Sequence, residues 1–186
     1  MKKILSIPFI VLVAAFIFTG CKNNKHKVAD LKPETEEAEK DTTIYGVCGE
    51  GTAMHSIELI TESGDTLNFM INDEDVEPSS SVVGGLLCGD RLAVISQTVD
   101  GEKIATKVIN LTTLLGKWTS VDKNFEIKEG GDIQSNVKAE SNPWTSWKIL
   151  NGHLLLNKDT FDIDVLGADS LSLENKNGIF VYKRQK

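Results

Sequence analysis

The sequence is poor in the residues that catalytic and metal sites require. Its 186 residues include three cysteines and three histidines. No Cys-x-x-Cys pair occurs, and His26, His55 and His153 are scattered along the chain. There is no Gly-x-Ser-x-Gly segment, and no serine or cysteine has a histidine placed in a recognisable nucleophile pattern. We therefore expect no enzymatic activity, no metal site and no cofactor.

Clusters of lysine and arginine with interleaved aromatic residues are also missing. The formal net charge is -7 and aromatic residues make up 6% of the chain. A protein that binds DNA or RNA needs a basic surface to displace counterions from the phosphates. The composition therefore excludes nucleic acid as an expected partner. Attachment to a membrane therefore has to come from lipid rather than from charge.

Long apolar runs are limited to one segment near the amino terminus. Residues 4–18 are apolar except for Ser6 and Pro8, and they follow Lys2 and Lys3. This run is too short and too abruptly ended to span a bilayer, and it is typical of a signal peptide. We therefore assign residues 1–20 to a signal peptide.

The end of this run, Phe18-Thr-Gly-Cys21, resembles the lipobox of bacterial lipoproteins. The resemblance implies cleavage just before Cys21, a diacylglyceryl thioether on its sulfur and acylation of the new amino terminus. Each buried methylene contributes about 0.8 kcal/mol, so several acyl chains anchor a protein stably. The resemblance implies a lipid-anchored envelope protein, with the outer membrane as its expected address. The alternative is an ordinary secretory signal with a chance cysteine, although such signals favour Ala-x-Ala-like sites.

Residues 21–42 carry many charges and few large apolar side chains. The run 34–39 contains four glutamates. Such a composition cannot bury a core, so it predicts a flexible acidic tether behind the anchor. Once Cys21 is assigned to the anchor, Cys48 and Cys88 remain as an even pair. A disulfide between them would stabilise the fold by about 4 kcal/mol in an oxidising compartment, and two buried thiols are an equal alternative.

Residues 43–112 contain five strand-like segments, with β-branched residues, alternation and glycine punctuation. They are 44–50, 56–61, 66–71, 91–98 and 103–110. Ser63-Gly64-Asp65 and Asp100-Gly101 predict hairpins. The long connection 72–89 lies where a five-stranded Greek-key barrel inserts a helix or an irregular crossover. This order resembles an OB-fold; another small barrel or a sandwich is the alternative.

Residues 113–186 contain eight strand-like segments with regular turn signals. They are 116–120, 124–128, 132–138, 144–150, 153–157, 161–166, 170–174 and 179–184. Asn151-Gly152 is a strong signal for a hairpin with a type I′ turn. Apolar residues alternate with polar ones, as in Phe161, Ile163 and Val165, so one face of each strand is apolar. Eight such strands close well into an up-and-down barrel, and the bulky interior residues leave little room.

Gly116-Lys-Trp118 on the first of these segments looks like the G-x-W motif of the lipocalins. Arg184, near the end of the last segment, lies where that family places a basic residue. The resemblance implies that the guanidinium packs across the Trp118 indole and closes one end of the barrel, a contact of about 1 to 2 kcal/mol. The segment is much shorter than a usual lipocalin, so the resemblance implies a miniature domain. One buried aromatic residue on a strand is the alternative.

Trp144 and Trp147 form the densest aromatic cluster. Three positions apart on one strand, they should face opposite sides of the sheet. One indole would then line a ligand mouth or contact a partner, and core filling with one protective aromatic residue is the alternative. Asp162 and Asp164 share a strand face that we expect to be solvated. The run 73–77 is acidic but lacks the spacing of a known calcium loop.

Charge divides unequally between the two segments. Residues 43–112 hold eleven acidic and three basic side chains, whereas residues 113–186 hold ten of each. The first barrel should therefore repel anionic polymers. Our leading hypothesis is a non-catalytic envelope protein that binds a small apolar or amphipathic molecule in the second barrel or its mouth. The alternative is a protein-interaction or envelope-sensing module in which both barrels are solid. This plan resembles that of some envelope-stress lipoproteins, which pair a lipocalin-like barrel with an OB-like domain in the opposite order.

Overall fold

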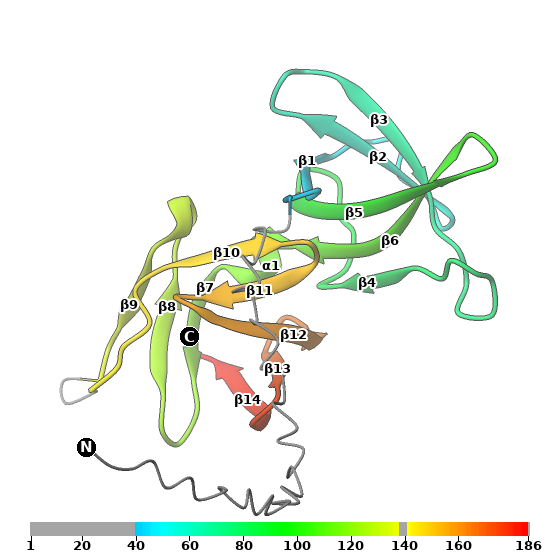
Figure 1. The fold of residues 1–186 in the computed structure, drawn as a ribbon. Coiled ribbons are helices and arrows are strands. Elements are labelled where there is room, and N and C mark those ends of the chain that lie inside the picture. Colours follow the sequence, from blue (N-terminus) through cyan, green and yellow to red (C-terminus); the bar gives the residue numbers. More distant parts are fainter. Residues whose placement is uncertain (1–39, 138–140, 186) are drawn as a thin grey trace, which may run out of the picture. The chain divides into compact units, whose positions relative to one another are not determined.

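The computed structural model describes residues 40–137 and 141–185, and they form two β-barrels (Figure 1). The predicted fold class, an all-β chain with a five-stranded and then an eight-stranded barrel, is confirmed. The expected signal peptide, the lipidation site Cys21 and nearly all of the expected tether lie outside the described residues. None of the described helices is long and apolar enough to cross a membrane.

The first barrel has the strand order of an OB-fold. Its strands are β1 (Ile44–Cys48), β2 (Ser56–Thr61), β3 (Thr66–Met70), β5 (Arg91–Val99) and β6 (Glu102–Asn110). The sheet order β3-β2-β1-β5-β6 closes through a parallel pairing of β3 with β6 at Met70 and Ile104. Alternate residues of these strands point inward, and they bury Cys48, Ile57, Leu59, Phe69, Leu92, Val94, Ala105 and Val108.

The long crossover of the first barrel contains a strand instead of a helix. β4 (Ser81–Val83) pairs in parallel with β6. Ser80 anchors its start, because its hydroxyl donates to the Ala105 carbonyl (2.5 Å) and accepts from the Asn72 N–H (2.9 Å). The segment therefore extends the sheet as a sixth strand at its edge.

Cys48 and Cys88 are free thiols, so the structure does not form the disulfide between them. Cys48 faces the core of the first barrel and is 1% exposed. Its sulfur lies 3.3 Å from the Thr52 hydroxyl. Cys88 is exposed to solvent. With one thiol buried and the other exposed, the structure matches neither the disulfide nor the alternative of two buried thiols.

A single turn of helix, α1 (Leu111–Leu114), joins the two barrels. Asn110 caps it, because its side-chain oxygen accepts from the Thr113 N–H at 2.9 Å. The Asn110 amide also donates to the Asp90 carboxylate (2.6 Å), which satisfies a side chain that is 1% exposed. Leu111 and Leu114 are buried in the apolar cluster of the second barrel. The helix therefore fixes where the first strand of that barrel starts.

The second barrel is an antiparallel meander of eight strands. They are β7 (Gly116–Thr119), β8 (Asn124–Ile127), β9 (Ile133–Ser135), β10 (Trp147–Leu150), β11 (His153–Leu156), β12 (Asp159–Leu166), β13 (Ser170–Asn175) and β14 (Gly178–Arg184). A 3₁₀ turn, η1 (Glu129–Gly131), joins β8 to β9. The last strand pairs with the first at Arg184 and Trp118. An isolated bridge from Asp132 to Ser146 nearly closes the wall between β9 and β10.

The predicted turn of this barrel is confirmed, and the predicted apolar face is confirmed for Phe161 and Ile163 only. Val165, which the pattern placed on the same face, is 49% exposed, because a bulge shifts the register of β12 against β13 between Ile163 and Val165. Asn151 and Gly152 have φ values of +48° and +82°, as a type I′ turn requires. Phe161 and Ile163 are buried, whereas Asp162 and Asp164 are exposed. The exposed Asp162 carboxylate makes two polar contacts: it lies 2.8 Å from His153 Nδ1 and accepts from Lys107 Nζ at 3.5 Å.

Candidate functional site

One end of the second barrel is closed by an arginine over a tryptophan. The Arg184 guanidinium carbon lies 4.1 Å from the centre of the Trp118 ring, and Trp118 is 0% exposed. The structure thus brings together the two residues that the lipocalin resemblance indicated. The Trp118 indole N–H donates to the Leu114 carbonyl at 2.8 Å. We call Gly116, Trp118 and Arg184 with α1 the closed end.

The guanidinium also binds three main-chain carbonyl groups, which belong to two segments of the chain. It donates from Nη1 to the Leu115 carbonyl at 2.8 Å and from Nε to the Ala168 carbonyl at 2.5 Å, and Nη2 contacts the Thr113 carbonyl. Burial lowers the pKa of Arg184, and the nearby Asp169 carboxylate opposes that shift. Arginine stays charged because its ordinary pKa is above 12. These bonds therefore tie α1, the β12–β13 turn and β14 together.

Gly116 is required by this arrangement. Its φ is +122°, and a Cβ built on it would lie 2.6 Å from Arg184 Nη1. Any other residue would meet both a strained backbone and the guanidinium. This is the physical reason for the glycine in the G-x-W sequence, and the sequence alone did not reveal it.

The opposite end of the second barrel holds a cavity of about 900 Å³. We call this cavity and its lining the mouth. Its described lining comes from the β7–β8 turn, the segment before β10, the start of β12 and the β13–β14 hairpin: Thr119, Ser120, Val121, Asp122, Lys123, Asn142, Trp144, Asp159, Phe161, Asn175, Asn177, Ile179, Phe180, Val181, Tyr182 and Lys183. The interior is therefore filled at the closed end and hollowed at the mouth.

Aromatic rings form the floor of the mouth. Trp144 lies edge-to-face with Phe161 at 5.8 Å, and its ring centre is 6.4 Å from that of Tyr182. Phe125 packs below, 5.1 Å from both Trp144 and Tyr182. Such contacts are each worth about 0.5 to 1.5 kcal/mol beyond area burial and they lock the rings in place. The floor is aromatic, so it suits an apolar group better than a polar one.

The rim of the mouth combines apolar and charged side chains. Phe180 is 36% exposed and packs 6.0 Å from Phe161. Lys123 places its ammonium 4.4 Å from the centre of the Trp144 ring. With Asp122, Asp159 and Lys183, the rim carries two charges of each sign. It therefore does not select an anion or a cation by net charge.

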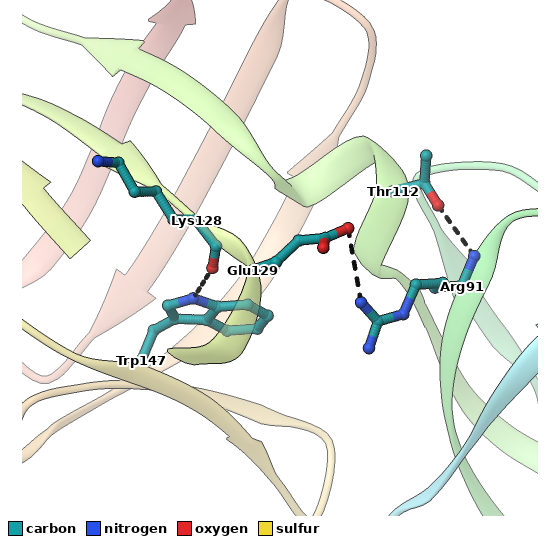
Figure 2. A network of polar contacts seen from close by, with 5 residues as sticks. All are labelled: Arg91, Thr112, Lys128, Glu129 and Trp147. Carbon is teal, nitrogen blue, oxygen red and sulfur yellow. Dashed lines mark hydrogen bonds and ion pairs between the residues drawn. The ribbon is translucent and has the colours of Figure 1, made fainter. Parts of the chain in front are cut away.

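Trp144 and Trp147 do not face opposite sides of one strand, so that expectation was wrong. β10 starts at Trp147, and the alternation of a strand does not extend back to Trp144. Trp144 is 9% exposed in the core, and Trp147 packs partly buried against the same cluster. Only Trp144 lines the mouth. Figure 2 shows Trp147 donating from Nε1 to the Lys128 carbonyl (2.8 Å), next to the ion pair of Glu129 with Arg91 (3.7 Å).

Sequence reasoning missed Asn157, which positions Trp144. Asn157 has a φ of +56° in the β11–β12 turn. Its side-chain oxygen accepts from the N–H groups of Thr145 (2.9 Å) and Ser146 (3.1 Å), and its amide donates to the Pro143 carbonyl (3.1 Å). These bonds hold both neighbours of Trp144. An asparagine before a lysine between two apolar runs was the available signal, since asparagine tolerates positive φ.

No described group of three or more histidine, cysteine, aspartate or glutamate side chains is placed to hold a metal ion. No protein-family model, curated protein or solved structure matches the chain. The candidate site is therefore defined by its own geometry.

Proposed function

We propose that the protein is a non-catalytic binding protein that holds a small apolar or amphipathic molecule in the mouth of its second barrel. The observation that carries the proposal is the cavity of about 900 Å³ over the Trp144, Phe161 and Tyr182 rings. Ligand pockets in proteins have volumes of about 300 to 1,000 Å³ and combine apolar walls with a few polar groups. The mixed charge of the rim fits an amphipathic ligand with its polar end outward.

Intrinsic fluorescence tests this function, because Trp144 is the indole at the floor of the mouth. We expect dodecanoic acid, retinol or haem to quench the fluorescence of the full-length chain. Trp144→Phe should remove most of the quenching while calorimetry still detects binding. Phe180→Ala should weaken binding about tenfold, since it removes part of an apolar wall.

Val165→Ala is the matched control for Phe180→Ala. Val165 is 49% exposed on β12 and does not line the mouth. Its substitution should leave the affinity unchanged. If none of the three compounds gives quenching or heat at millimolar concentration, the function is not small-molecule binding.

The proposed place of action is the bacterial cell envelope, with the chain anchored through acylated Cys21. Support comes from the lipobox-like sequence and from the acidic segment 22–42, which would separate the barrels from the membrane. Metabolic labelling with an alkyne fatty acid should mark the wild-type chain. Cys21→Ser should abolish the label, while Cys88→Ser should keep it. Labelling that persists in Cys21→Ser would contradict the anchor, and fractionation of the two membranes tests the outer-membrane address.

A further inference from the structure

The wall of the second barrel has a break between β14 and β7. β14 pairs with β13 from Gly178 to Lys183, but it pairs with β7 only at Lys183 and Arg184. β7 ends at Thr119, and the chain then turns into β8. Residues 178–182 of β14 therefore extend past β7, and we call them the overhang.

Main-chain groups of the overhang face this break. Successive residues of an antiparallel strand direct their N–H and C=O groups to opposite sides. The Gln185 N–H donates to the Lys117 carbonyl next to β7 at 2.9 Å. Alternation back along β14 puts the main-chain groups of Val181 and Ile179 on the same side. Within the described part of the chain, no main-chain group bonds to these two residues across the break.

The side chains of the overhang are unusual for an exposed strand edge. Ile179 and Val181 are 62% and 60% exposed. Exposed edges normally carry lysine, proline or a bulge, because a flat apolar edge recruits another strand. Here the overhang combines unpaired main-chain groups with apolar side chains. Both features are those of a strand that receives a partner strand.

The cavity of the mouth lies at the same break. Its lining includes residues 119–123 on one side of the break and residues 179–183 on the other. A strand laid beside the overhang would direct every second side chain inward. A large side chain opposite Phe180 would enter the cavity above the Trp144 floor. The cavity thus lies where the inward side chain of an added strand would be placed.

We propose that the overhang docks an extended peptide segment of a partner protein by strand addition. The peptide would exchange main-chain hydrogen bonds with Ile179 and Val181 and insert one large apolar side chain into the mouth. A second copy of β14 is a poorer occupant of this break than a partner peptide. In each copy the inward side chain Phe180 already packs on Phe161 of the same chain, with ring centres 6.0 Å apart. Two paired overhangs would leave both cavities without an inserted side chain. This inference goes beyond the small-molecule function and rests on the main chain of β14.

The test uses a capped six-residue peptide of alternating threonine and valine with one phenylalanine at an inward position. We expect the full-length chain to bind it with micromolar affinity by calorimetry. Binding should protect the amides of Ile179 and Val181 from hydrogen exchange. A copy of the peptide with N-methyl groups on the amides that face β14 should bind at least tenfold more weakly, because methylation removes the donors.

Two variants at one position separate main-chain from side-chain recognition. Val181→Pro removes an N–H that faces the break and should weaken peptide binding at least tenfold. Val181→Thr keeps that N–H and should bind within about threefold of wild type. The proposed function is tested separately on the wild-type chain. Dodecanoic acid should bind to it whatever the result with the peptide, and Phe180→Ala should weaken that binding, so failure here and failure of the proposed function give different results.

Three outcomes would overturn the inference. The first is absence of binding at millimolar peptide, and the second is binding without protection of Ile179 and Val181. The third is a concentration-dependent dimer that protects these amides in the absence of peptide, which would assign the overhang to a second copy. If Val181→Pro fails to fold, the N-methylated peptide still decides the outcome on the wild-type chain.

Discussion

The two ends of the second barrel use aromatic and cationic side chains for opposite purposes. At the closed end, Arg184 lies 4.1 Å over a fully buried Trp118 and bonds three carbonyl groups. At the mouth, Lys123 lies 4.4 Å over Trp144, which forms the floor of a cavity of about 900 Å³. A cation therefore lies over an indole at both ends, but one end is closed and the other contains a cavity.

The difference comes from what surrounds each cation. The planar guanidinium of Arg184 bonds in several directions at once, which a lysine ammonium cannot match in geometry. It joins β14 to α1 and to the β12–β13 turn, so the strands at this end cannot separate. At the mouth β7 ends early and β14 continues. We expect stability to depend on the closed end and binding to depend on the mouth.

The largest expected effect is that of Arg184→Ala. It removes the cation over Trp118 and leaves three carbonyl groups without their charged donor. We expect a loss of about 4 kcal/mol in the free energy of unfolding, measured by urea denaturation with far-UV circular dichroism. Lys183→Ala, one residue earlier and exposed, should change it by less than about 0.5 kcal/mol. Similar losses in both variants would contradict the role of the closed end.

Part of the difference between the two ends of the second barrel could be predicted from the sequence. All eight strands of the second barrel were predicted, because alternation and turn residues report directly on a sheet with one apolar face. The Gly116, Trp118 and Arg184 set was found through a resemblance. The sequence did not show why position 116 has to be glycine. That requirement depends on the Arg184 guanidinium, whose Nη1 would lie 2.6 Å from a Cβ at position 116. Tertiary contacts of this kind leave no local pattern.

The mouth was less accessible than the closed end. The pattern placed Trp144 on a strand, whereas β10 starts three residues later at Trp147. The hydrogen bonds of Asn157 hold the segment around Trp144 in place of a strand ladder. The end of β7 was predicted to within one residue. The short pairing of β14 with β7 was not, because the pairing length of two strands at opposite ends of the domain depends on closure.

A second prediction separates the strain at Gly116 from its contact with Arg184. Gly116→Ala should cost about 2 to 3 kcal/mol in the free energy of unfolding, from positive φ and from the clash with the guanidinium. Gly178→Ala is the matched control: its φ is +131°, but no atom lies within 4 Å of the added Cβ. It should cost about 1 kcal/mol. Thermal or urea denaturation of both variants measures the difference.

A double substitution sharpens this result. With Arg184→Ala already present, the added Cβ at Gly116 has no guanidinium to meet. Gly116→Ala should then cost no more than Gly178→Ala costs in the same background, so the two substitutions at the closed end should be non-additive. Strict additivity would show that the approach of Arg184 to Gly116 is not what requires the glycine.

The smallest expected effect on stability lies at the mouth. Asn157→Gly keeps the positive φ of the turn and the main-chain bond from residue 157 to the Ser146 carbonyl, but it removes the side-chain bonds to Pro143, Thr145 and Ser146. We expect a loss of only about 1 kcal/mol, because the core of the barrel stays intact. The Trp144 indole should nevertheless become more mobile, which tryptophan fluorescence anisotropy measures. Lys158→Ala, the next residue of the same turn, should change neither quantity. Asn157 acts through the segment that carries Trp144. Its loss should therefore reduce the free energy of dodecanoic acid binding more than the free energy of unfolding. A larger loss in the free energy of unfolding would instead show that Asn157 mainly stabilises the barrel.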